Sequence, residues 1–186
     1  MDQLDISVTP KKSVISRATT AGLYIAAATI VLGLIEYVTG INKVLLTNTP
    51  LSLLNSLVML VITAYFIHTA IRLYRDQDNG SYLTLGNGIG LGTLAGLVAG
   101  IISAVWTVIF MQFIAPDLVD TIKQVQMEKM QEQGQSEEQI EQLMAMSSFA
   151  FSPPFMAVIV ALSSVFFGFL CGLISGLVLK RERPYA

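Results

Sequence analysis

The architecture of this chain rests on the segment Gly86-Asn87-Gly88-Ile89-Gly90-Leu91-Gly92-Thr93-Leu94-Ala95-Gly96-Leu97-Val98-Ala99-Gly100. Its glycines recur at every fourth position, at Gly88, Gly92, Gly96 and Gly100. In water each glycine in a helix interior costs about 1 kcal/mol relative to alanine, which argues against a soluble helix. In a bilayer, small residues on one face let a second helix approach closely and gain dispersion contacts. We therefore predict a membrane helix that packs through this row.

A second row with the same spacing lies later in the chain, at Ser164, Gly168, Gly172 and Gly176. The two rows predict glycine-zipper packing between the third and fourth membrane helices. Packing between subunits, or sliding of the helices in a channel, is the alternative. Gly86 and Gly90 form another small-residue face roughly opposite the first row, because a step of two residues turns a helix by about 200°. We expect a neighbouring helix to contact this face, or the helix to flex there.

The composition places the chain among membrane proteins. Of its 186 residues 53% are hydrophobic and only 13% are charged, whereas soluble domains have about 25% charged residues. The net charge of −2 excludes a basic nucleic-acid surface, and the single cysteine, Cys171, excludes an internal disulfide. Phosphate-binding loops, paired-cysteine motifs, His-Glu metal helices and nucleophile elbows are missing from the sequence. We therefore expect no enzyme activity, cofactor or metal.

Four apolar runs are long enough to cross a bilayer, which takes about 20 helical residues. They cover about residues 20–41, 51–74, 85–114 and 155–179. The first run exceeds the apolar core of a secretory signal, about 7–15 residues, and lacks a small-residue cleavage site, so we expect it to be retained. The segment 42–50 between the first two runs is predicted to be a polar loop, and the charged segment 72–80 a compact turn.

The segment 115–152 between the last two runs is acidic and amphipathic. Gly134 interrupts its apolar pattern, and Ser136-Glu137-Glu138-Gln139 is typical of a capping box that opens a second helix. The predicted fold is therefore an all-α protein of four transmembrane helices, with a helical hairpin inserted between the last two.

The basic residues predict the orientation. With the N-terminus inside, eight of the eleven basic residues are cytoplasmic, namely Lys11, Lys12, Arg17, Arg72, Arg75, Lys180, Arg181 and Arg183. This bias favours cytoplasmic N- and C-termini, an extracytoplasmic hairpin and a bacterial inner membrane. Anionic lipid headgroups are the expected contacts of five of these residues, Arg72, Arg75, Lys180, Arg181 and Arg183.

Two ionisable side chains fall within the predicted spans. Glu36 is either a proton-coupling or ligand-binding acid, or a carboxyl group that bonds to Asn55 or Gln112 or stays protonated. Its shallow depth favours the second interpretation. His68 lies near the cytoplasmic end of its span, beside Arg72, and is expected to be an interfacial helix residue rather than a proton relay.

Several short motifs occur in a characteristic order. They are Tyr74-Arg75-Asp76-Gln77, Asn79-Gly80, Leu83-Thr84-Leu85-Gly86 leading into Gly88, Pro116-Asp117, the Gln/Glu/Met-rich hairpin, and Gly172-Leu173-Ile174-Ser175-Gly176. In these motifs the chain resembles a family of small inner-membrane proteins found mainly in the Bacteroidota, domain of unknown function 4199. The resemblance implies four spans, no established activity and no catalytic residues. It also implies an envelope-glycan context, because such proteins are often encoded near a membrane glycosyltransferase.

Three functions follow as hypotheses. The first is a non-enzymatic accessory or scaffold subunit of the bacterial envelope, which lies in the lipid bilayer and binds a membrane-protein partner or a second copy of itself through the glycine rows or the hairpin. The alternative is a small homo-oligomeric channel or transporter with Glu36 in or near the pathway. The third is an enzyme for lipid-linked substrates, with polar residues of the segment 72–87 at one leaflet.

Overall fold

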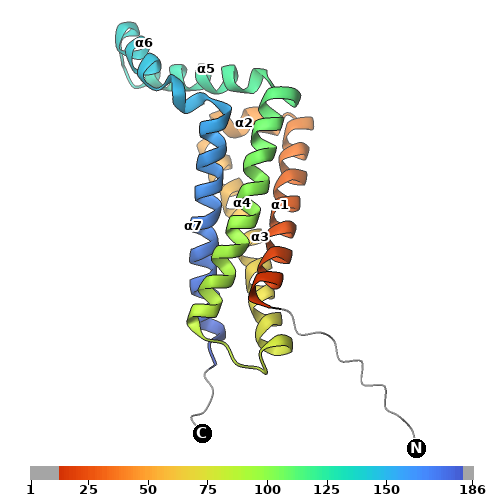
Figure 1. Ribbon diagram of the computed structural model, residues 1–186. Helices are drawn as coiled ribbons and strands as arrows, with labels where there is room; N and C mark the ends of the chain where they lie inside the picture. Colours follow the sequence, from red (N-terminus) through yellow and green to blue (C-terminus); the bar gives the residue numbers. More distant parts are fainter. Residues whose placement is uncertain (1–12, 182–186) are drawn as a thin grey trace, which may run out of the picture.

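Four long apolar helices run side by side and form the body of the molecule (Figure 1). The computed structural model describes residues 13–181. The long helices are α1 (Val14–Val38), α3 (Thr49–Leu73), α4 (Leu85–Ile109) and α7 (Pro153–Leu179). Each has at least 25 residues, which is enough to cross the hydrocarbon core of a bilayer. The predicted all-helical fold with four membrane helices is confirmed, and the chain is a multi-pass membrane protein.

The four helices are not arranged in chain order. α4 packs against α1 on one side and against α7 on the other, and α3 closes the bundle between α7 and α1. Although α3 and α4 are consecutive long helices, they contact each other little. α1 begins at the end of the bundle where α7 ends, here called the terminal end (Figure 1). The opposite end, which carries α5 and α6, is called the hairpin end.

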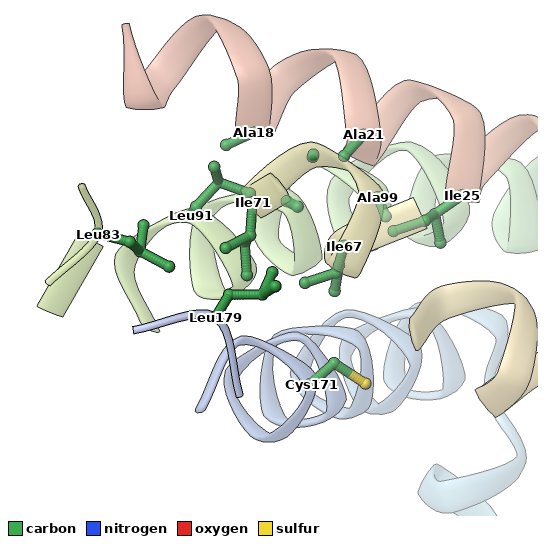
Figure 2. Close-up of a cluster of buried hydrophobic side chains, with 12 residues drawn as sticks. Ala18, Ala21, Ile25, Ile67, Ile71, Leu83, Leu91, Ala99, Cys171 and Leu179 are labelled. Carbon is green, nitrogen blue, oxygen red and sulfur yellow. The ribbon is translucent and has the colours of Figure 1, made fainter. Parts of the chain in front are cut away.

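The tightest packing lies toward the terminal end of the bundle. Figure 2 shows side chains of all four long helices meeting there, with Ile71 of α3 close to Leu91 of α4 and Ile67 further along α3. All three are fully enclosed. Toward the hairpin end α3 packs less closely, since Leu53 and Val61 are 66% and 60% exposed. In a membrane, lipid chains cover such side chains at little cost, because lipid is as apolar as the side chains themselves.

α4 and α7 approach each other more closely than side chains would allow. A Cβ atom placed on Gly88 would lie 2.7 Å from the Cα atom of Gly176. A Cβ atom on Gly92 would lie 2.5 Å from the Cα atom of Gly172 and would also collide with the carbonyl oxygen of Gly168. The obstacles are backbone atoms, which cannot move aside as a flexible side chain can. The two small-residue rows therefore face each other within one chain.

The same contact continues toward the hairpin end. The Ser164 hydroxyl donates a hydrogen bond of 2.9 Å to the carbonyl oxygen of Gly96 across the two helices. A Cβ atom on Gly100 would lie 3.2 Å from the Cα atom of Ala161. Ser164 thus adds an interhelical hydrogen bond to a contact in which the other close approaches mainly involve backbone atoms.

A further close contact joins α4 to α1 and involves Gly22, which the sequence analysis did not select. A Cβ atom on Gly22 would lie 2.7 Å from both the carbonyl oxygen of Ala95 and the Cβ atom of Val98. By contrast, no neighbouring group among residues 13–181 lies within 4 Å of the Cβ positions of Gly86 and Gly90. The expected contact of a neighbouring helix with that face is therefore wrong. α4 is contacted on two sides, but the second contact is made through the glycine of α1.

The segment 42–50, predicted to be a polar loop, contains a short helix, α2 (Ile41–Thr47). Gly40, with φ +73°, turns the chain between α1 and α2, a backbone conformation that glycine adopts without strain. Ile41, Val44 and Leu45 then recur at helical spacing, which the polar residues among them obscured. Asn48 ends α2 and caps α3 by accepting a 3.0 Å hydrogen bond from the amide of Leu51.

The segment 115–152 forms the two predicted helices, α5 (Asp117–Glu132) and α6 (Glu137–Met146). α5 lies across the hairpin end of the bundle and α6 projects beyond it (Figure 1). Gly134, with φ +79°, makes the turn between them. The predicted capping box is confirmed, because Ser136 and Gln139 each bond the other's backbone amide, at 3.3 and 3.0 Å.

We predict that Gly92→Ala lowers the stability of the bundle by about 1–3 kcal/mol, the usual cost of overpacking a tight contact. The added methyl group would force α4 away from the backbone of α7. Gly90→Ala on the same helix is the matched control, since its methyl group would point into open space. Thermal unfolding in mild detergent, followed by circular dichroism, measures both variants. Equal melting temperatures would contradict the prediction.

Candidate functional site

The connection between α3 and α4 carries three charged side chains at the terminal end, Arg75, Asp76 and Asp78. It was predicted to be a compact turn, but the helix continues through a π-helical turn, η1 (Tyr74–Asp78). The wider turn is closed by a 2.9 Å hydrogen bond from the Asn79 amide to the Tyr74 carbonyl oxygen. The chain reverses only at Gly80 and Ser81, both with positive φ. Arg75 and Asp76 are therefore held on a helix rather than on a loop.

Arg17 of α1 makes the most buried ion pair of this region. Its Nε lies 2.6 Å from the Asp78 carboxylate, and the two side chains are only 14% and 4% exposed. A second guanidinium nitrogen of Arg17 donates to the Gln77 side-chain oxygen at 2.9 Å. From the sequence, Arg17 contributed only to the predicted orientation. In the structure it fastens the start of α1 to the end of α3.

Arg72 and Arg75, predicted to contact lipid headgroups, have different surroundings. Arg75 pairs with Asp76 at 2.6 Å and donates to the Leu179 carbonyl oxygen at 3.4 Å. Arg72 is 67% exposed and lies 3.7 Å from the same aspartate. The Arg75 guanidinium therefore bonds to groups of the protein itself, whereas most of the Arg72 side chain is exposed. Headgroup contact stays a prediction for both.

The end of α7 is joined to the start of α4 by backbone pairing. Leu83 and Arg181 exchange two hydrogen bonds, of 2.9 and 3.0 Å, in an antiparallel bridge. Leu83 is completely buried, while Lys180 and Arg181 are exposed. The remaining predicted headgroup residue, Arg183, lies outside the described residues, as do Lys11 and Lys12. The bridge ties the two helices together at the terminal end, while the charged side chains next to it stay exposed.

Glu36 and His68 are placed near opposite ends of the bundle. Glu36 is half-buried close to the hairpin end of α1, and His68 is half-buried in the part of α3 nearer the terminal end. Within residues 13–181, no hydrogen bond joins the Glu36 carboxylate to Asn55 or Gln112, so that expected pairing is not formed. The structure does not bring these side chains into one site.

A hollow of about 420 Å³ lies at the hairpin end, between α1, α2 and α5. Its lining includes one cation and one anion, Lys43 and Asp117, among polar and small residues. The full lining is Tyr37, Val38, Thr39, Gly40, Asn42, Lys43, Ala115, Asp117, Leu118 and Thr121. This hollow was not predicted from the sequence. The signal that could have indicated it is that Lys43 and Asp117 each lie within three residues of the end of a predicted span.

Two interactions fix the elements around the hollow. The Tyr37 hydroxyl donates a 3.0 Å hydrogen bond to the carbonyl oxygen of Ile114, and its ring packs edge-on against Phe110 with centroids 5.2 Å apart. The Lys129 ammonium donates to the carbonyl oxygen of Leu46 at 3.0 Å and so ties α5 to the end of α2. The hollow is therefore bordered by segments that are joined to one another and is open on its remaining side.

We predict that Arg17→Gln destabilises the bundle by about 3–5 kcal/mol, because it removes the guanidinium group that pairs with the buried Asp78 carboxylate. Lys123→Gln is the control, since Lys123 forms an exposed pair with Asp120 at 3.6 Å and such pairs contribute about 1 kcal/mol or less. Thermal unfolding in detergent compares the two, and the exchange R17D/D78R should recover part of the loss. A melting temperature of Arg17→Gln equal to that of the control would refute the role of the pair.

Comparison with known proteins identifies a family to which the chain is similar. No curated protein and no solved structure matches the chain. One family, described as "Protein of unknown function (DUF4199)", matches residues 20–181. This range takes in most of α1, the other long helices, the charged turn and the hairpin, and it confirms the resemblance seen in the sequence motifs. The chain belongs to this family of proteins of unknown function.

Proposed function

We propose that the protein is a non-enzymatic accessory or scaffold subunit of the bacterial envelope. It lies in the inner membrane with both termini in the cytoplasm and the α5–α6 hairpin outside. Its role is to hold another membrane protein through that hairpin. The observation that carries the proposal is the projection of α6, with exposed apolar side chains, from a bundle whose small-residue rows are already engaged.

The internal contact of the two rows narrows the choice of partner surface. Gly88 and Gly92 of α4 lie against Gly176 and Gly172 of α7 within one chain. This arrangement supports a glycine zipper that builds the monomer. A helix of another protein cannot use the same rows without separating α4 from α7. The hairpin is then the better candidate of the two surfaces that the sequence suggested.

The projecting part of the hairpin combines apolar and acidic side chains. Met146 of α6 and Phe149 just after it are 70% and 62% exposed. Glu137, Glu138 and Glu141 are exposed on the same short helix. Exposed apolar side chains on a projecting segment are typical of interaction sites, and methionine adapts to irregular partner surfaces. The surface suits a protein partner with an apolar patch bordered by basic residues.

The envelope-glycan context supports the choice of partner class. The sequence motifs resemble proteins often encoded near a membrane glycosyltransferase. A subunit that binds such an enzyme from the extracytoplasmic side would need a rigid membrane anchor and a projecting contact surface. The tight α4–α7 pair and the α5–α6 hairpin would supply these two parts. We therefore propose an integral membrane enzyme of envelope-glycan assembly as the partner.

A photo-crosslinking amino acid at Met146 tests the contact in native membranes. We expect one discrete adduct with another membrane protein, because Met146 is among the most exposed side chains of the hairpin. The same amino acid at Leu162, which is 62% exposed in the middle of α7, is the control. An adduct twice the mass of the chain would instead indicate a second copy of it. Failure of Met146 to give any protein adduct would refute the hairpin contact.

Single cysteines test the orientation in a Cys171→Ser background. We expect a membrane-impermeant maleimide to label Met146→Cys in intact spheroplasts, because the hairpin is proposed to lie outside. Gly86→Cys, exposed at the terminal end of α4, should react only after the cells are opened. Labelling in the opposite order would invert the proposed topology.

A further inference from the structure

We propose that the hollow between α1, α2 and α5 binds the headgroup of a zwitterionic aminophospholipid, which carries a phosphate and a primary ammonium group. This ligand site goes beyond the proposed scaffold role and does not depend on it. The volume of about 420 Å³ falls within the range of small-molecule sites, about 300–1,000 Å³. It is ample for a headgroup of this kind.

The position of the hollow suits a lipid headgroup. Its walls include Tyr37 and Val38, the last residues of α1, and Ala115, which directly follows the span Leu85–Ile114. Two membrane-spanning segments therefore end at this level, where the hydrocarbon core gives way to headgroups. Tyrosine is enriched at that boundary. Val38 is 82% exposed beside the hollow and offers an apolar surface along which an acyl chain can leave.

The lining carries one positive and one negative side chain, which a ligand with two opposite charges would match. Lys43 comes from α2 and Asp117 from α5, and both line the same hollow. Among residues 13–181 no ion pair joins these two side chains. They therefore do not neutralise each other. A phosphate near the Lys43 ammonium and a ligand ammonium near the Asp117 carboxylate would pair both charges at once.

The hydroxyl groups of the lining favour an ammonium group on the ligand. Thr39 donates its hydroxyl proton to the carbonyl oxygen of Ile35 at 2.7 Å, and Thr121 donates to that of Asp117 at 2.9 Å. Each hydroxyl oxygen thus keeps its lone pairs for a donor from outside. A primary ammonium has three N–H donors to offer. A purely anionic lipid such as phosphatidylglycerol has no cation to place beside Asp117.

The experiment uses the full chain in nanodiscs that contain equal amounts of phosphatidylethanolamine and phosphatidylglycerol with identical acyl chains. Native mass spectrometry measures which lipids stay bound after release. We expect the wild-type protein to retain phosphatidylethanolamine severalfold over phosphatidylglycerol. Asp117→Asn should lower this ratio toward that of the disc, because the group that selects the ammonium is lost. Lys43→Gln should reduce the retention of both lipids, because both carry a phosphate.

Two control variants carry the same charge changes outside the hollow. Asp120→Asn and Lys123→Gln alter an exposed ion pair on α5 that does not line it. Both should keep the wild-type ratio and amount of bound lipid. The proposal is overturned if the wild-type protein shows no preference between the two lipids. It is equally overturned if Asp117→Asn leaves the preference unchanged, or if the controls lose it to the same extent.

Discussion

The backbone contact between α4 and α7 is the central packing interaction of the bundle. In a membrane, apolar side chains gain little by leaving lipid, so helices associate through close packing and interhelical hydrogen bonds. Gly92 and Gly172 bring two backbones together with no side chain between them, and Ser164 adds a hydrogen bond to the Gly96 carbonyl oxygen. α1 then packs on the other side of α4 through Gly22, and α3 completes the bundle. A tight central pair thus supports two outer helices.

The two ends of this bundle differ in how tightly they pack and in how their charged groups are placed. The terminal end is closed by the buried Arg17–Asp78 pair and by the backbone bridge between Leu83 and Arg181. The hairpin end is more open: α3 packs loosely there, α6 projects, and a polar hollow lies between α1, α2 and α5. The buried charges at the first end are paired within the chain, whereas Lys43 and Asp117 at the second line a shared space. The proposed protein contact and the proposed headgroup site both lie at the hairpin end.

α5 connects the two proposed binding surfaces. Its first turn, with Asp117, lines the hollow, and further along the helix Lys129 is tied to α2. The chain then turns at Gly134 into α6, which carries the exposed side chains of the proposed protein contact. The proposed lipid site and the proposed protein contact therefore lie on one continuous hairpin. We expect such an arrangement in a scaffold that binds its partners at the membrane surface. The family to which the chain belongs has no described activity, so these assignments rest on the chemistry of the residues.

Features that repeat locally along the chain could be predicted without the fold. The apolar runs, the rows of small residues around Gly92 and Gly172, and the capping box at Ser136 depend on spacings of a few residues, so their periodicity identifies them. The pairing of distant residues became visible only in the folded chain. Arg17 and Asp78 are 61 positions apart, Gly22 is matched to the Ala95 region of α4, and Lys43 shares its hollow with Asp117. The periodicity of residue types along the sequence cannot reveal such pairs, because they depend on how the four helices pack around each other.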